Sequence, residues 1–268
     1  MRRPVRVLTV AASVAVVALL GACDAGSHDA AADPTRAHAG ASATPTPTAP
    51  VELTAATFAD TLGAAMTKAA SYDFTMNMTA QGQAVTARGS AEVGTSAATP
   101  TLAMTMDIAD QGTIEMRFVG GKAYMSMPQL TKGKFFVIDP KDTSNPLASS
   151  FDQLTQQSDP AQSIREIQGA VVSVAKAGAP VQLDGVAAQP YDVTLDTSKI
   201  ASLQSQLGST DVKLPATLTY RYWVGPDNRL RKVTTSVLGT TVDMTFSHWG
   251  AGAPVTAPSA DEITDSPF

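Results

Sequence analysis

Polar and apolar residues alternate with a period of two over much of the chain, as in strands that have one dry and one wet face. From Tyr72 to Ala80 every second residue is apolar, which predicts one such strand. A turn at Gln81-Gly82 leads to a weaker strand from Gln83 to Glu92. The same pattern predicts further strands at 101–108, 113–119, 122–127, 134–138, 171–177, 187–195, 218–224, 230–237 and 241–249.

Helical spacing predicts three regions of a different kind. Thr54 is a plausible N-cap for a helix that runs to Ala70, with apolar residues three and four positions apart. After a loop at 140–146, residues 147–169 carry helical signals, with Asp159 as N-cap before Pro160. A third helical piece is predicted from 196 through Ile200 to 208.

These elements together predict an α+β fold. About ten antiparallel strands would form a strongly curved sheet, a half-open β-barrel, with helices packed over its concave side. The pattern leaves open whether the sheet closes. The tail from Gly250 is rich in Pro and is expected to be irregular.

The first fifty residues have a different composition. A positive start, Met1 to Arg6, and an apolar run to Leu20 lead into Leu-Gly-Ala-Cys, which resembles a bacterial lipobox ending in Cys23. We therefore expect a signal peptide at 1–22 and a lipidated Cys23, which is the single cysteine of the chain. Two acyl chains give stable attachment, so the expected location is extracytoplasmic, on the outer face of the cell membrane.

Residues 23–50 are predicted to be a disordered linker. They consist mainly of Ala, Ser, Thr, Gly and Pro and offer few large apolar groups to bury. The Thr-Pro repeat at 44–48 fits O-glycosylation or a plain spacer equally well. A single domain is then expected over 51–265.

Composition and motifs argue against several functions. The formal net charge is −5 and no cluster of Lys and Arg is visible, so nucleic acid is not an expected partner. The sequence carries no Gly-x-Ser-x-Gly elbow, no His-Glu-x-x-His and no phosphate-binding Gly-rich loop. We therefore expect no enzyme activity, no cofactor and no metal. His248 is the one histidine after the linker, and we expect it to be structural.

Methionine gives the best indication of a ligand cavity. Eight of the 10 Met residues lie between Met66 and Met127, and Met is common on surfaces that accept varied apolar ligands. The alternative is that these side chains fill a core. The candidate cavity residues share the apolar faces of the first strands: Phe74, Met76, Met78, Leu102, Met104, Met106, Ile114, Met116 and Phe118.

Several short motifs follow the lipobox, the Pro/Thr linker and the first helix. They are Val119-Gly120-Gly121-Lys122-Ala123-Tyr124, Asp184-Gly185-Val186 before Tyr191, Tyr222-Trp223-Val224-Gly225, and Phe246-Ser247-His248-Trp249-Gly250. With them the chain resembles actinobacterial lipoproteins of the LppX/LprA/LprF/LprG group, which are similar in fold to the LolA and LolB carriers. The resemblance implies a half-barrel with a helical lid around an apolar cavity, and a role in binding or moving lipids. It transfers one functional residue, Cys23.

Two functions remain open at this point. The first is a lipoprotein that binds or carries a lipid, a glycolipid or another hydrophobic ligand. The second is a non-catalytic structural or accessory lipoprotein, a partner of an envelope transporter or sensor, that uses the same fold without a bound lipid. In both cases we expect a monomer attached to the membrane through acylated Cys23.

Overall fold

The structure is a computed structural model that describes residues 52–80, 82–92, 101–108, 112–139, 167–200 and 215–267. The predicted signal peptide, Cys23 and the linker lie outside these residues, as do the loop at 140–146 and most of the helical segment 147–169. No helix within the described ranges is long and apolar enough to cross a membrane.

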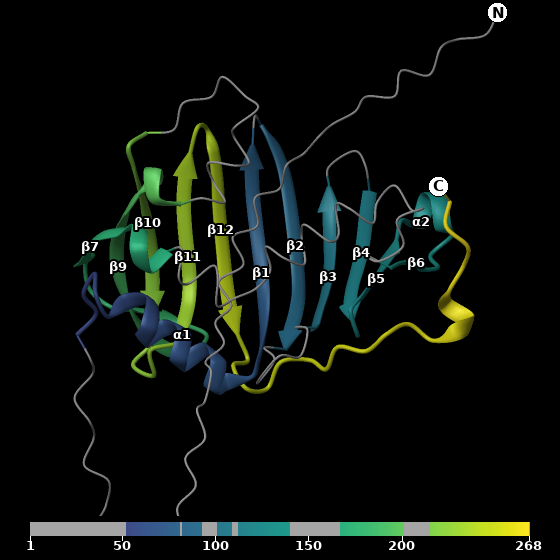
Figure 1. Ribbon diagram of the computed structural model, residues 1–268, viewed down its shortest axis with the longest axis horizontal. Coiled ribbons are helices and arrows are strands. Elements are labelled where there is room, and N and C mark those ends of the chain that lie inside the picture. Colours follow the sequence, from purple (N-terminus) through teal and green to yellow (C-terminus); the bar gives the residue numbers. More distant parts are fainter. Residues whose placement is uncertain are drawn as a thin grey trace, which may run out of the picture.

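One antiparallel sheet of twelve strands forms the body of the protein (Figure 1). Its order is β6-β5-β4-β3-β2-β1-β12-β11-β10-β9-β7, and β8 pairs with β9 outside this path. The first and last strands are therefore neighbours in the middle of the sheet. The strands are β1 (Ser71–Ala80), β2 (Gln83–Glu92), β3 (Thr101–Ile108), β4 (Gly112–Val119), β5 (Lys122–Ser126), β6 (Phe136–Ile138), β7 (Val171–Lys176), β8 (Val181–Leu183), β9 (Val186–Asp196), β10 (Thr217–Val224), β11 (Leu230–Val237) and β12 (Thr240–Ser247).

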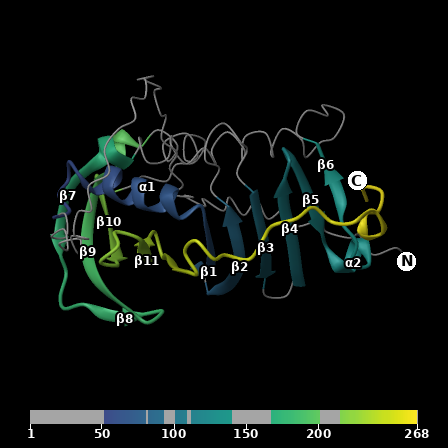
Figure 2. The ribbon, with the colours of Figure 1, turned by 90° about the horizontal axis from the view of Figure 1, so that it is seen from below.

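The sheet is strongly curved and does not close. Its two ends bend toward the side that carries helix α1 (Figure 2), while β6 and β7 stand at opposite edges of the strand order. This confirms the predicted half-open barrel. The strand count exceeds the expected ten partly because β8 was not predicted: a strand of three residues is too short to show a period.

Helix α1 (Phe58–Ala69) lies on the concave side and buries its apolar stripe there. The ring of Phe58 meets the ring of Tyr222 edge to face, with centroids 5.1 Å apart. The helix begins later than predicted because Thr57, not Thr54, is the N-cap. The Thr54 N–H donates to the Thr57 hydroxyl, and residues 55–57 form a turn.

The other helical predictions have mixed outcomes. Residues 167–170 are helical, as expected for the end of the second region. The third region gives only a short 3₁₀ turn, η1 (Thr197–Lys199), because Ile200 is already extended; residues 201–208 lie outside the described ranges. Helix α2 (Pro128–Thr131), a single turn after β5, was not predicted.

Two clusters of buried side chains form the core. The larger joins α1 to the concave face of β1 and of β9 to β12, and includes Phe58, Leu62, Phe74, Val193, Leu195, Tyr222 and Phe246. The smaller lies at the other end of the sheet, where Ala123, Phe136 and Ile138 are fully buried. Strands β2, β3 and β4 lie between these two centres.

The chain after Gly250 crosses one end of the strands and is here called the C-terminal strap, residues 250–264 (Figure 2). Its main-chain N–H groups donate to polar side chains of the sheet: Ala253 to Asp73 and Val255 to Glu92. At its far end it exchanges two main-chain hydrogen bonds with Phe135, just before β6. The strap is irregular as predicted, apart from the 3₁₀ turn η2 (Ala260–Glu262).

Candidate functional site

The predicted cavity residues share one face of the sheet. In the antiparallel register Phe74, Gly89, Met104 and Met116 are successive partners across β1 to β4. Directly paired residues point to the same side. The register partners two residues further along each strand, in either direction, place the other candidates on that same side. We call this surface the methionine face; on β1, β3 and β4 it comprises Phe74, Met76, Met78, Leu102, Met104, Met106, Ile114, Met116 and Phe118.

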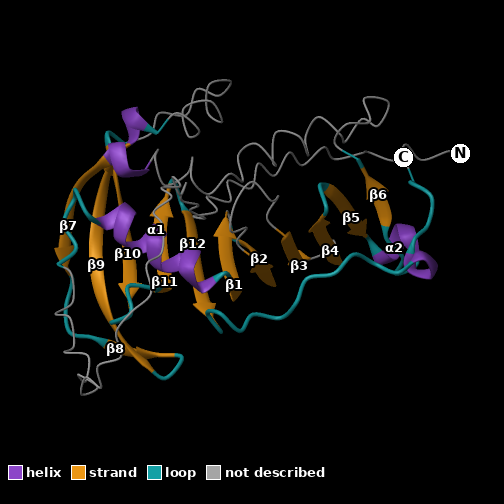
Figure 3. Cartoon of the chain, turned by 60° about the horizontal axis from the view of Figure 1, so that its bottom comes forward, coloured by secondary structure: helices purple, strands orange, loops and turns teal. Residues whose placement is uncertain are grey.

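Burial differs across this face. Phe74 and Met76 on β1 are 7% and 5% exposed, and belong to the buried part of the fold. The candidates on β3 and β4 are all only half-buried. Concave residues under α1, such as Val193 and Tyr222, are by contrast almost completely buried. Figure 3 shows α1 lying over the other half of the sheet, away from β3 and β4.

Strand β2 contributes small side chains to the methionine face. Ala87, Gly89 and Ala91 alternate along it, between the large residues of β1 and those of β3. A Cβ at Gly89 would lie 2.9 Å from Cζ of Phe74 and 2.1 Å from the carbonyl oxygen of Ala103. The Phe74 ring therefore packs directly on the main chain of β2. The resulting surface carries rows of flexible side chains beside a strip of small ones.

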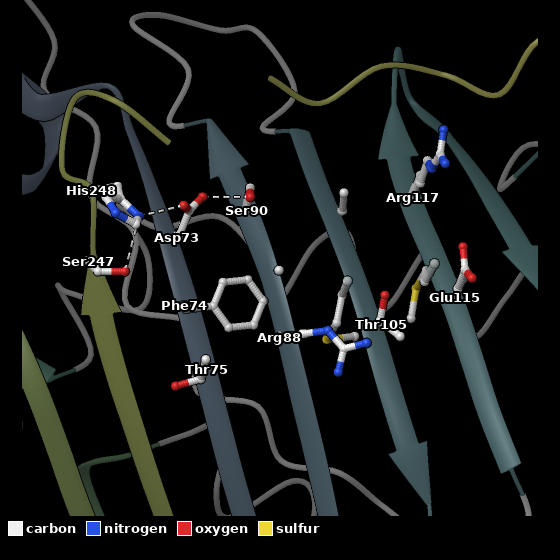
Figure 4. Close-up of a pocket in the computed structure, with 14 residues that line it drawn as sticks. Asp73, Phe74, Thr75, Arg88, Ser90, Thr105, Glu115, Arg117, Ser247 and His248 are labelled. Atoms are coloured by element: carbon white, nitrogen blue, oxygen red, sulfur yellow. Dashed lines mark hydrogen bonds and ion pairs between the residues drawn. The ribbon is translucent and has the colours of Figure 1, made fainter. Parts of the chain in front are cut away.

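A groove lies on the opposite, convex face and was not predicted. It has a volume of about 440 Å³ and is open to solvent. Figure 4 shows side chains from β1, β2, β3, β4 and the end of β12 around it. Its polar lining consists of Asp73, Thr75, Arg88, Ser90, Thr105, Glu115, Arg117, Ser247 and His248. We call it the convex groove.

Asp73 is held by three donors at one side of this groove. Ser90 Oγ donates to Oδ1 at 2.6 Å, the Ala253 N–H donates to the same oxygen at 3.0 Å, and His248 Nδ1 lies 2.8 Å from Oδ2. Partial burial alone would raise the pKa of Asp73, but these hydrogen bonds outweigh it and hold the pKa below its usual value. His248, expected to be structural, thus helps to fix a carboxylate that also holds the C-terminal strap.

The lowered pKa of Asp73 predicts an effect of pH on stability. Folding favours the ionised form of Asp73. The contribution of this carboxylate to stability is therefore complete above its ordinary pKa of 3.8, and it is lost as the pH falls through the lower pKa of the folded chain. Asp73→Asn should therefore lower the urea midpoint at pH 7, and the difference from the native chain should shrink in strong acid. Asp184→Asn, in an exposed turn, is the control and should change little at either pH. An Asp73 effect of equal size at both pH values would contradict this account.

Sequence reasoning missed the convex groove for a physical reason. Polar residues at alternate strand positions are the default for a solvated face. The groove depends on two small convex residues, Ser90 and Ala103, that are register partners, and no pattern within one strand shows that pairing. They lie between Asp73 on β1 and Arg117 on β4, whose larger side chains stand at either side. No group of three or more residues that could hold a metal ion occurs in the described part of the chain.

Comparison with known proteins bears on the fold. No protein-family model matches the chain, and no curated protein sequence matches it. The structure is similar to that of the lipoprotein LppX of Mycobacterium tuberculosis, with a TM-score of 0.54 at 11% identity, over 75% of this chain and 98% of LppX. It is also similar to LprF from Mycobacterium bovis, with a TM-score of 0.50 at 17% identity, over 76% and 96% of the two chains.

The fold is thus that of an open, curved antiparallel sheet with an apolar concave side and a helix across part of it. More specifically, it is the LppX/LprF-type lipoprotein fold. This agrees with the resemblance seen in the short motifs, most of which form turns and strand ends. Gly120 and Gly121, for example, have φ of 60° and 75° in the tight turn between β4 and β5.

Proposed function

We propose that this protein is an envelope lipoprotein that binds or carries a lipid, a glycolipid or another hydrophobic ligand on its methionine face. In this proposal Cys23 is acylated and holds the domain at the outer face of the cell membrane. The residues before 52 would serve as signal peptide, anchor and flexible tether. The domain itself would catalyse no reaction; it would bind an apolar molecule and release it.

The observation that carries the proposal is the incomplete burial of the methionine face on β3 and β4. Large apolar side chains that stay partly exposed side by side usually mark a surface that something else covers. Here the residues lie on the inside of a curved sheet, and the face includes the unbranched, adaptable side chains of Met104, Met106 and Met116. Such side chains can follow an apolar ligand of irregular shape.

The energetics suit exchange with a membrane. Removing an apolar chain from water gains roughly 0.8 kcal/mol per methylene, and a bilayer already provides that gain. Transfer between the membrane and the methionine face is then nearly balanced. A carrier of this type can load and unload without an energy source.

A pair of variants on neighbouring residues tests the proposal. Met106→Glu places a carboxylate on the methionine face, whereas Thr105→Glu places the same group on the convex side of the same strand. The chain from residue 24 onward, which lacks the acylation site, would be purified without detergent and analysed by native mass spectrometry and organic extraction. We expect lipid to co-purify with the native sequence and with Thr105→Glu, and at least about tenfold less with Met106→Glu, because a charge is costly to desolvate.

Melting curves of both variants provide the control for folding. A folded Met106→Glu chain that retains a full load of lipid would contradict the proposal. A native chain that is empty after purification from a lipid-rich source would favour the accessory role without a bound lipid.

A further inference from the structure

The convex groove is separated from the methionine face by the sheet itself. Its polar side chains stand on the convex side, whereas Phe74, Met104 and Met116, which also border it, carry theirs on the concave side. A ligand in the convex groove therefore cannot be the apolar ligand of the methionine face. Binding in this groove is independent of the proposed function.

Two register rows build the groove and explain its shape. One row runs Ser247, Asp73, Ser90, Ala103, Arg117 across β12, β1, β2, β3 and β4. The next runs Thr245, Thr75, Arg88, Thr105, Glu115. In the first row the two small residues, Ser90 and Ala103, form the floor of the groove between the longer side chains of Asp73 and Arg117. The hollow thus results from the sequence of two strands and from their register.

The groups around the hollow are fixed by contacts on their outer sides. Asp73 is held by its three donors. Arg117 lies over the ring of Phe135, 4.7 Å from its centroid, and donates to the Thr256 carbonyl of the strap at 3.4 Å. Arg88 is paired with Asp107 at 3.3 Å. The contacts of Asp73 and Arg117 restrict these two side chains before any ligand arrives, which lowers the entropy cost of binding. The Arg88–Asp107 pair is exposed to solvent and restricts Arg88 less.

Several hydrogen-bonding positions remain open. Among the described residues the carboxylate of Glu115 has no partner, and neither does Nε2 of His248. A guanidinium carries five N–H donors, and the contacts of Arg88 and Arg117 use few of them. Donors and acceptors therefore alternate around the groove, from His248 to Asp73 at one side and from Arg117 to Glu115 at the other (Figure 4).

This arrangement selects among ligand classes. Apart from Ala103, the side chains on the groove side of the sheet are polar or charged, so a ligand with only apolar groups would leave these hydrogen-bonding groups without partners. A polyanion would meet the two carboxylates Asp73 and Glu115. A sugar fits, because each hydroxyl both donates and accepts, and carboxylate, guanidinium and imidazole side chains satisfy both roles. We propose that the convex groove is a binding site for a sugar unit of a glycan, with Glu115, Arg88 and Arg117 as its principal contacts.

The test uses the full chain in lipid nanodiscs and isothermal titration calorimetry with two defined probes, the β-1,4-linked tetramer of N-acetylglucosamine and maltotetraose. We expect saturable binding of at least one probe. Glu115→Gln, which removes a charge without changing shape, should weaken it about tenfold, the loss typical of a charge-assisted hydrogen bond. Glu52→Gln, the same change at an exposed position outside the groove, should bind like the native chain.

A second pair of variants shows whether the groove itself is the site. Ala103→Met fills the floor of the groove and should abolish binding, whereas Ala84→Met, the same change at an exposed convex position of β2 outside the groove, should leave it intact. Melting curves and lipid content, measured on the same samples, report folding and the separate methionine face. The proposal is overturned if neither sugar binds the native chain, or if Ala103→Met binds as the native chain does. Sugar binding with an unloaded methionine face would overturn only the lipid proposal.

Discussion

Phe58→Ala should lower the free energy of unfolding by about 3–5 kcal/mol, the range observed when a buried aromatic side chain is truncated. Phe58 is 3% exposed and is the first residue of α1. Its ring packs edge to face on Tyr222, which is itself 2% exposed in the middle of β10. The substitution removes the ring contact that holds the start of α1 on the sheet, and it leaves a cavity at the centre of the larger core.

Urea unfolding followed by circular dichroism measures this effect. Leu130→Ala provides the control, because Leu130 on α2 is 59% exposed and its truncation should change the free energy by no more than about 0.5 kcal/mol. A loss for Phe58→Ala as small as that of Leu130→Ala would show that α1 is not docked on the concave face through this ring.

Gly89→Ala should cost about 3 kcal/mol or more, although it adds only one methyl group. The new Cβ would lie 2.1 Å from the Ala103 carbonyl oxygen, which belongs to the main chain of β3 and cannot turn away. It would also lie 2.9 Å from the Phe74 ring. Strands β2 and β3 would have to separate locally, and overpacking of this kind is strongly destabilising.

Gly169→Ala is the matched control for this second prediction. Gly169 lies in the helical residues 167–170, and a Cβ there meets nothing within 4 Å. The change should be neutral, or stabilising by up to about 1 kcal/mol because alanine favours the helix. If the two alanine variants unfold at the same urea concentration, Phe74 does not pack closely on β2 at Gly89, and this prediction is contradicted.

The strands with strong alternation were predictable from the sequence. For the strand from Tyr72 to Ala80 the expected limits differ from those of β1 by one residue. The reason is that one face of β1 is buried and the other exposed: Phe74 and Met76 are buried, whereas Thr75 and Asn77 are exposed. The same alternation assigned all nine candidate cavity residues to one face.

Features that depend on distant partners were not predictable. The convex groove exists because Ser90 and Ala103 are register partners, and no pattern within either strand shows which residue lies opposite. The C-terminal strap is ordered by Asp73, Glu92 and Phe135, which are far away in the sequence. The start of α1 moved for a local reason: residues 55–57 form a turn in which the Thr54 N–H donates to the Thr57 hydroxyl, so the helix begins only at Phe58.

The central claim is that an apolar ligand lies on the methionine face. It can be tested by NMR, with ¹³C-labelled Met methyl groups in the chain from residue 24 onward and an added long-chain fatty acid as the probe. We predict nuclear Overhauser contacts between acyl-chain protons and the methyl groups of Met104, Met106 and Met116. The claim would be contradicted if these methyl groups show no contact and the acyl chain touches only exposed residues such as Leu130 and Leu238.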